Sequence, residues 1–145
     1  ANTRVFADDV PVYRYADVLL MYAEIANKEG NDPSVYINQV RQRAYGSNYS
    51  PAVAYTNGTF ADNELAILKE RDKEFVAESK RWFDVCRLQD ASGNPLVFSR
   101  DASYGQVAGV VEPILKQGTE SHKLLWPINV DIMSRDETVT QTPGY

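Results

Sequence analysis

The sequence predicts a mainly α-helical fold. Two stretches, residues 14–30 and 31–46, repeat apolar residues at three- and four-residue steps, and a longer stretch, residues 63–88, does the same. Segments rich in Gly, Pro, Ser and Asn lie between and after these stretches, as is typical of loops. The chain has 145 residues, of which 43% are hydrophobic and 24% charged, so it is long enough for one domain with its own core.

The first two stretches predict an antiparallel helical hairpin. In "RYADVLLMYAEIANKEG" Gly30 ends the helix, and in "NDPSVYINQVRQRAYG" Asp32 caps the next helix, Pro33 takes its first position and Gly46 stops it. The connection between them is short, which makes the two helices antiparallel neighbours. The predicted buried faces consist of Tyr15, Val18, Leu19, Tyr22, Ile25 and Ala26 in the first helix, and of Tyr36, Ile37, Val40 and Ala44 in the second.

This hairpin resembles one tetratricopeptide-like repeat. Such repeats need roughly three or more neighbours for stability, and the sequence contains a single convincing hairpin. The chain also starts with "ANTRVFADDV", which lacks an initiating Met and an apolar signal region. We therefore expect the chain to be a fragment of a longer protein.

The remainder predicts a loop, one long helix and an irregular tail. Residues 46–63 form the loop, and the helix runs from about Asn63 to about Leu88 with an apolar side. That side consists of Leu65, Leu68, Phe75, Val76, Ser79, Trp82, Phe83 and Cys86. In residues 89–145 the expected elements are short strands at "PLVF" and "QVAGVV", an extended "KLLWPIN", one or two helical turns at "VDIMSRD" and a turn at "TPGY".

The densest charge lies in "ERDKEFVAESKRWFD", and two interpretations compete for it. In a continuous helix Arg71 reaches Glu74 and Glu78 reaches Arg81, which would make a structural ion-pair network. A glycosidase would instead need two carboxyl groups facing each other across a cleft, about 5–5.5 Å or about 6.5–9.5 Å apart. Glu74 and Glu78 point the same way, and arginine neighbours lower a carboxyl pKa where a general acid needs it raised. We favour the structural network and assign no catalytic residue.

The sequence offers little for metal, cofactor or nucleic-acid binding. His122 is the one histidine, and Cys86, the one cysteine, lies on an apolar helix side, where a packed thiol is expected. No phosphate-binding glycine loop is present, so we expect no cofactor. The net charge is −5 without a basic run, which argues against nucleic acid as a partner.

Aromatic residues in and beside loops are the best ligand-binding candidates. Aromatic faces stack on the apolar faces of sugar rings, while nearby amides satisfy hydroxyl groups. The alternative is that these rings only fix the loops to the body. The candidates are Tyr45, Tyr49, Tyr55, Phe60 and Tyr104, interleaved with Asn48, Asn57 and Asn63.

Four ordered segments resemble the C-terminal end of SusD/RagB-family proteins. They are "RYADVLLMYAEIANKEG", "YINQVRQRAYG", "ILKERDKEFVAESKRWFDVCRL" and "LLWPINVDIMSRD" with its closing "QTPGY". Two positions depart from the family pattern: Asn129 stands for the second proline of P-I-P, and Thr142 stands for the asparagine before Pro143. By this resemblance residues 1–145 are the C-terminal part of a SusD-like domain.

The resemblance implies a fold, a function and partners. The fold would be part of an α-superhelix with tetratricopeptide-like repeats, in which Arg71, Glu74, Glu78 and Arg81 belong to the structural framework. The protein would be a non-catalytic outer-membrane lipoprotein at the cell surface, anchored through an N-terminal cysteine that this chain lacks. It would bind oligosaccharides, or peptides in some members, for a SusC-like TonB-dependent transporter. A purely structural repeat-type module for protein interaction is the remaining alternative.

Overall fold

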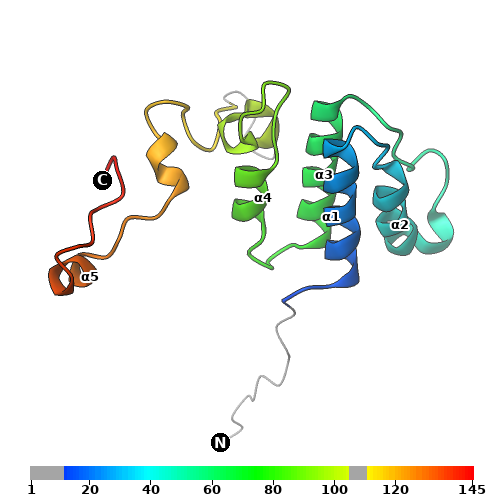
Figure 1. The fold of residues 1–145 in the computed structure, drawn as a ribbon. Coiled ribbons are helices and arrows are strands. Elements are labelled where there is room, and N and C mark those ends of the chain that lie inside the picture. Colours follow the sequence, from blue (N-terminus) through cyan, green and yellow to red (C-terminus); the bar gives the residue numbers. More distant parts are fainter. Residues whose placement is uncertain (1–11, 105–110) are drawn as a thin grey trace, which may run out of the picture. The chain divides into compact units, whose positions relative to one another are not determined.

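The computed structural model describes residues 12–104 and 111–145, and this part of the chain is helical with no strand. The chain divides into two compact units, residues 1–59 and residues 60–145, which are described separately (Figure 1). The mainly α-helical fold predicted from the sequence is confirmed.

The first unit contains the predicted hairpin, formed by α1 (Tyr15–Lys28) and α2 (Ser34–Tyr45), followed by the 3-10 helix η1 (Gly46–Asn48). Gly30 ends α1 with a left-handed φ of 76°, and the Asn31 N–H then donates to the Ala26 carbonyl at 2.8 Å. Asp32 Oδ1 accepts the Ser34 N–H at 2.7 Å, which satisfies one of the first amides of α2. Gly30 and Gly46 therefore end their helices as predicted, whereas Pro33 occupies the N-cap and not the first helical position, since α2 begins at Ser34. Similarity to a tetratricopeptide repeat stays a prediction.

The buried face of α1 differs from the predicted one. Leu19 and Ala26 are buried, but Tyr15, Tyr22 and Ile25 are 73%, 52% and 51% exposed. The other buried residues form a neighbouring stripe of Leu20 with small and polar residues: Ala16, Asp17, Ala23, Glu24 and Asn27. Small side chains let the helix pack closely on this side. The periodicity of apolar residues alone does not predict this buried face.

In α2, likewise, only part of the predicted apolar face is buried. Ile37 and Val40 are buried as predicted, whereas Ala44 near its end is exposed. Tyr36 is half-buried and stacks on Tyr22, with ring centroids 5.7 Å apart. This aromatic pair holds the hairpin together on the exposed side of α1.

In the second unit the predicted single long helix is wrong. The chain forms α3 (Phe60–Glu74) and the short α4 (Arg81–Arg87). Between them Ala77 and Ser79 adopt left-handed φ values of 64° and 57°, which turn the chain away from the helix axis. As a consequence Val76 and Phe83, predicted to be apolar contacts, are 74% and 66% exposed.

The segment after α4 is packed without strands. The strand predicted at "PLVF" is wrong, because Leu96–Phe98 forms the 3-10 helix η2, with Leu96 and Val97 buried. The strand predicted at "QVAGVV" falls mainly on residues 106–110, which lie outside the described residues. Within the same packing, the buried Glu64 carboxylate accepts the Gln89 N–H at 2.9 Å. The elements that follow are η3 (Arg100–Ala102), η4 (Ser121–Leu124) and α5 (Val130–Arg135), where α5 confirms the predicted helical turns.

The chain end folds back onto the segment that follows η4. The Gln141 side chain donates to the Ile128 carbonyl at 3.0 Å and accepts the Ile128 N–H at 2.8 Å. The Tyr145 hydroxyl donates to the Leu125 carbonyl at 3.1 Å, and its ring meets the edge of His122 at 5.0 Å. The "LLWPI" and "QTPGY" segments thus lie beside each other, and α5 is in the stretch of chain that connects them.

The left-handed turn between α3 and α4 gives the first testable prediction. Replacing Ser79 by Gly removes the steric cost of a positive φ, so the free energy of unfolding should rise by about 0.5–1 kcal/mol, measured by urea titration. The control is Ser47→Gly, at an exposed position in η1 without a positive φ, which should give no gain. Equal effects of the two substitutions would contradict the strain argument.

Candidate functional site

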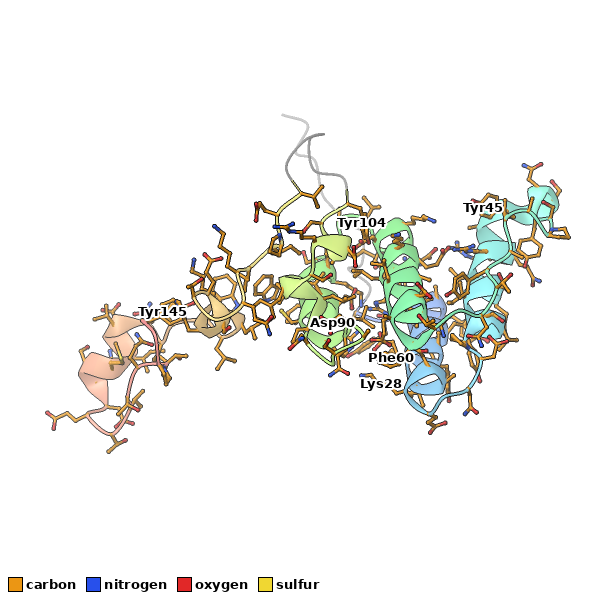
Figure 2. All side chains as sticks on the ribbon, turned by 90° about the horizontal axis from the view of Figure 1, so that it is seen from above. Lys28, Tyr45, Phe60, Asp90, Tyr104 and Tyr145 are labelled. Carbon is orange, nitrogen blue, oxygen red and sulfur yellow. The ribbon has the colours of Figure 1, made fainter. Side chains whose placement is uncertain are left out.

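The five predicted aromatic residues are divided between the two units. Figure 2 labels Tyr45 of the first unit and Phe60 and Tyr104 of the second. Tyr45, Tyr49 and Tyr55 lie at the end of α2 and in the loop that follows it, whereas Phe60 begins α3 and Tyr104 follows η3.

The loop after α2 is fastened to that helix by two polar side chains. Asn38 Oδ1 accepts the Tyr55 N–H at 2.7 Å and Asn38 Nδ2 donates to the Tyr55 carbonyl at 2.9 Å. Arg41 Nη1 donates to the Val53 carbonyl at 2.9 Å, and its guanidinium lies 5.6 Å from the centroid of the Tyr55 ring. These bonds satisfy backbone groups that irregular structure would otherwise leave unpaired, and they fix the loop conformation.

The rings of this loop differ in how much surface they offer a ligand. Tyr45 is 44% exposed, whereas Tyr49 and Tyr55 are half-buried. The amides of Asn48 and Asn57 are exposed in the same loop. Tyr45 is therefore the best-placed ring for stacking, while Tyr55 serves chiefly to hold the loop through its backbone and its contact with Arg41.

Tyr104 belongs to a polar cluster on the other unit. Its hydroxyl donates to Asp72, which also accepts from Arg81. Arg81 further donates to the Ala102 carbonyl at 2.5 Å, and its guanidinium lies 5.1 Å from the Tyr104 ring centroid, with Lys69 at 5.5 Å. Burial, together with the hydrogen bond to Asp72, raises the pKa of Tyr104, so the phenol stays neutral. These contacts support a structural role, and a role in ligand binding stays a prediction.

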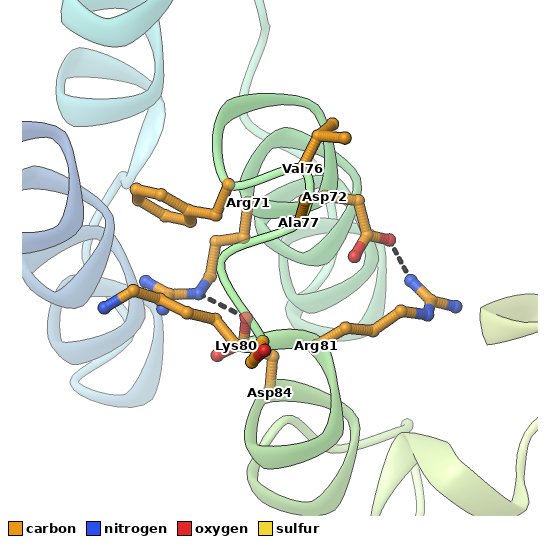
Figure 3. A pocket seen from close by; sticks show the side chains of 9 residues that line it. Arg71, Asp72, Val76, Ala77, Lys80, Arg81 and Asp84 are labelled. Atoms are coloured by element: carbon orange, nitrogen blue, oxygen red, sulfur yellow. Dashed lines mark hydrogen bonds and ion pairs between the residues drawn. The ribbon is translucent and has the colours of Figure 1, made fainter. Parts of the chain in front are cut away.

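The charged stretch forms ion pairs, but with aspartates that the sequence did not suggest (Figure 3). Arg71 Nε lies 2.8 Å from Asp84 Oδ2, with both residues at least 96% buried, and Arg87 Nη2 lies 2.9 Å from Asp84 Oδ1. Arg81 pairs with Asp72. The predicted pair between Glu78 and Arg81 assumed one continuous helix. Because α3 ends at Glu74, Glu78 and Arg81 do not lie one turn apart on that helix. The structural role of Arg71, Glu74, Glu78 and Arg81 remains a prediction. The ion pairs that the structure shows add Asp72 and Asp84 to this group.

A cavity of about 410 Å³ lies beside these ion pairs (Figure 3). Its acidic lining residues are Asp72 and Asp84, and each is paired with an arginine. Neither Glu74 nor Glu78, the carboxylates of the glycosidase hypothesis, lines it. The cavity therefore lacks the arrangement that this hypothesis required.

The described residues contain no cluster suited to a metal ion and no helix suited to a membrane. No three His, Cys, Asp or Glu side chains come together there as a metal site. Burial raises the pKa of the Cys86 thiol, which keeps it protonated and supports the packed-thiol interpretation. In the part of the chain that the structure describes, no helix has the length and apolar character needed to cross a membrane.

The fold and these sites define a helical protein that presents loops fixed by buried polar contacts. The chain belongs to the SusD family, whose family model matches residues 2–145.

Known relatives agree with this assignment. The chain is 38% identical over 81 residues to SusD-like protein P2 of Formosa agariphila, covering 52% of this chain and 16% of that protein. It is 25% identical over 137 residues to the starch-binding protein SusD of Bacteroides thetaiotaomicron, covering 94% of this chain and 22% of that protein. It therefore spans about a fifth of the length of these curated relatives.

Two solved structures are similar as well. A SusD superfamily protein of Bacteroides fragilis shares 45% identity and a TM-score of 0.86, covering 98% of this chain and 29% of that one. One from Bacteroides vulgatus shares 36% identity and a TM-score of 0.69, covering 100% of this chain and 30% of that one.

The buried Arg71–Asp84 pair gives a stability prediction. Asp84→Asn leaves two guanidinium groups without their carboxylate, so the free energy of unfolding should fall by about 3–5 kcal/mol in a denaturant titration. The matched control, Glu137→Gln at an exposed site, should change it by less than about 0.5 kcal/mol. A loss below 1 kcal/mol for Asp84→Asn would contradict a central role for this pair.

The fastening of the loop gives a second prediction. Asn38→Asp keeps the oxygen that accepts the Tyr55 N–H but removes the donor to the Tyr55 carbonyl, which should cost about 1–3 kcal/mol. Hydrogen exchange of amides in residues 49–59 should become faster, while exchange in the middle of α1 stays unchanged. Unchanged exchange in the loop would show that Asn38 does not hold it.

Proposed function

We propose that residues 1–145 are the C-terminal part of a non-catalytic, cell-surface glycan-binding protein. The whole protein would bind an oligosaccharide and deliver it to a SusC-like TonB-dependent transporter. It would be anchored in the outer membrane through a lipidated N-terminal cysteine outside this chain. The observation that carries the proposal is the family match across residues 2–145, which includes a relative named as starch-binding.

Within this chain, the loop after α2 is the part best suited to touch a glycan. Tyr45 offers an exposed ring for the apolar face of a sugar, and the exposed amides of Asn48 and Asn57 suit hydroxyl groups. Asn38 and Arg41 fix the loop before the ligand arrives, which lowers the entropic cost of binding. Tyr49 and Tyr55, which are half-buried, would support this surface more than they touch the ligand.

Calorimetry on the full-length protein that contains this chain tests the proposal. With a panel of neutral polysaccharides and peptides, we expect saturable heat for a glycan and no continuing heat from turnover. Tyr45→Ala should weaken that glycan about two- to twelvefold, the range given by one aromatic contact worth about 0.5–1.5 kcal/mol.

The matched control is Tyr13→Ala, which removes a 69% exposed tyrosine of the same unit and should leave glycan affinity unchanged. Heat that continues with substrate supply, together with new reducing ends, would show catalysis and refute the proposal. Saturable binding that Tyr45→Ala leaves intact would refute the role of the loop.

A further inference from the structure

We propose that the C-terminal segment, residues 121–145, packs with an exposed apolar surface against the part of the same polypeptide that lies outside these 145 residues. This terminal surface consists of Leu125, Trp126, Val130, Ile132 and Tyr145. The inference rests on one part of the proposed function, namely that this chain is the C-terminal part of a longer protein. It does not depend on whether that protein binds a glycan.

The C-terminal segment has no core of its own. The structure describes every residue from 121 to 145, and none of them is buried. Trp126 is 80% exposed, and the other members of the terminal surface are at least 50% exposed. Among the described residues of the second unit, the buried apolar side chains all lie between Ile67 and Leu115. The segment therefore adds no side chain to the buried core of its unit.

An ordered segment without buried apolar side chains needs a partner. Ordering a stretch of chain costs conformational entropy, and the burial of apolar surface is the main term that offsets this cost. The C-terminal segment is held instead by hydrogen bonds, such as those between Gln141 and Ile128. Such bonds add little net stability, because in the unfolded chain the same groups bind water. The apolar side chains of the segment are therefore expected to be buried against another surface.

The backbone of the segment is fixed in a way that leaves these side chains outside. The Tyr145 hydroxyl donates to the Leu125 carbonyl at 3.1 Å, and the Thr142 hydroxyl donates to the Trp126 carbonyl at 3.2 Å. Gly144 has a φ of 102°, and a Cβ added to it would lie 2.6 Å from the Cβ of His122. A backbone held in place before docking lowers the entropic cost of docking.

The composition of the terminal surface suits a protein partner. An aromatic anchor among aliphatic side chains is typical of the buried core of a protein–protein interface. A sugar site instead combines a ring with polar groups that bind hydroxyl groups, and Leu125, Val130 and Ile132 offer none. The expected partner is an apolar protein cleft that accepts the Trp126 indole.

The rest of the polypeptide is the favoured source of such a cleft. The structure from Bacteroides fragilis matches 98% of this chain with a TM-score of 0.86, yet this chain covers only 29% of that one. The same fold therefore occurs as one part of a much longer polypeptide. A covalently attached partner has a far higher effective concentration than a separate protein or a second copy. Contacts within one molecule are thus favoured over contacts between molecules.

Hydroxyl-radical footprinting of the full-length monomer, read by mass spectrometry, tests whether Trp126 is covered. We expect its oxidation to be about tenfold slower in the folded protein than in urea, because a ring in an interface core is fully buried. A ring that keeps its 80% exposure would be oxidised nearly as fast in both conditions, which would overturn the inference.

Photo-cross-linking of the full-length protein identifies what covers the ring. A benzophenone amino acid in place of Trp126 should form cross-links within one molecule to peptides outside residues 1–145. Cross-links confined to residues 1–145, or cross-links between two copies, would overturn the inference. Protection of Trp126 that appears only after malto-oligosaccharide is added would overturn it as well, because the ring would then be a platform for sugar.

A substitution and its matched control test the role of Trp126 as the anchor. In the full-length protein Trp126→Ala should lower the urea midpoint of unfolding and speed the oxidation of Tyr145, which belongs to the same terminal surface. The control, Glu137→Ala, removes an exposed charged side chain of the same segment and should change neither, because charged residues are depleted from interface cores. Equal effects of the two substitutions would contradict the anchor role.

The outcomes distinguish this inference from the proposed function. A Trp126 ring that is protected and cross-links outside residues 1–145 supports the inference even if the protein binds no glycan. A protein that binds a glycan while Trp126 stays exposed leaves the glycan-binding proposal standing and overturns the inference.

Discussion

The buried ion pair between Arg71 and Asp84 is the interaction on which the second unit depends. Because α3 ends at Glu74, nothing in the helical backbone fixes where α4 must lie, and two left-handed residues separate the helices. Arg71 reaches from α3 to Asp84 in α4, and Asp72 of α3 reaches Arg81 at the start of α4. Two ion pairs therefore connect α3 to α4 across the turn between them. A buried pair contributes little net stability over apolar packing, but breaking it is costly, so its main effect is to specify a single arrangement. Left-handed conformations cost about 1–2 kcal/mol each for residues other than Gly, so the two ion pairs hold a turn that the local backbone does not favour.

In both units a side-chain amide holds an irregular segment. The amide hydrogen-bonds to the N–H and the carbonyl of one backbone residue, as a neighbouring strand would. Asn38 binds both the N–H and the carbonyl of Tyr55, and Gln141 binds both groups of Ile128. A primary amide can do this because it carries a donor and an acceptor side by side. In the described part of the chain, which contains no strand, this satisfies backbone groups that a sheet would otherwise pair. It also explains why "LLWPI" and "QTPGY" occur together at the end of the chain, since Gln141 joins them.

Local signals made the hairpin predictable, whereas the break between α3 and α4 left no such signal. Asp32, Gly30 and Gly46 act within a few residues of their own positions, so their effects follow from the sequence. Ala77 and Ser79 are not residues that normally mark a left-handed turn, and apolar periodicity continued through them. The ion pairs were missed for the same reason: Asp84 lies in the next helix from Arg71, and only the turn brings them together. The loop after α2 was predicted from its composition, whereas no local signal indicated that Arg81, Asp72 and Lys69 surround Tyr104. The ligand-binding role of the aromatic candidates stays a prediction.

The second helix, α2, separates two surfaces of different chemistry through the spacing of two arginines. Arg41 and Arg43 are two residues apart, which turns them by about 200° around the helix axis. Arg41 faces the loop and binds its Val53 carbonyl, whereas Arg43 lines a groove of about 480 Å³ between the start of α1 and the end of α2. The loop surface is aromatic and rich in amides, whereas the floor of the groove is apolar. One short helix therefore positions the loop on one side and borders the groove on the other.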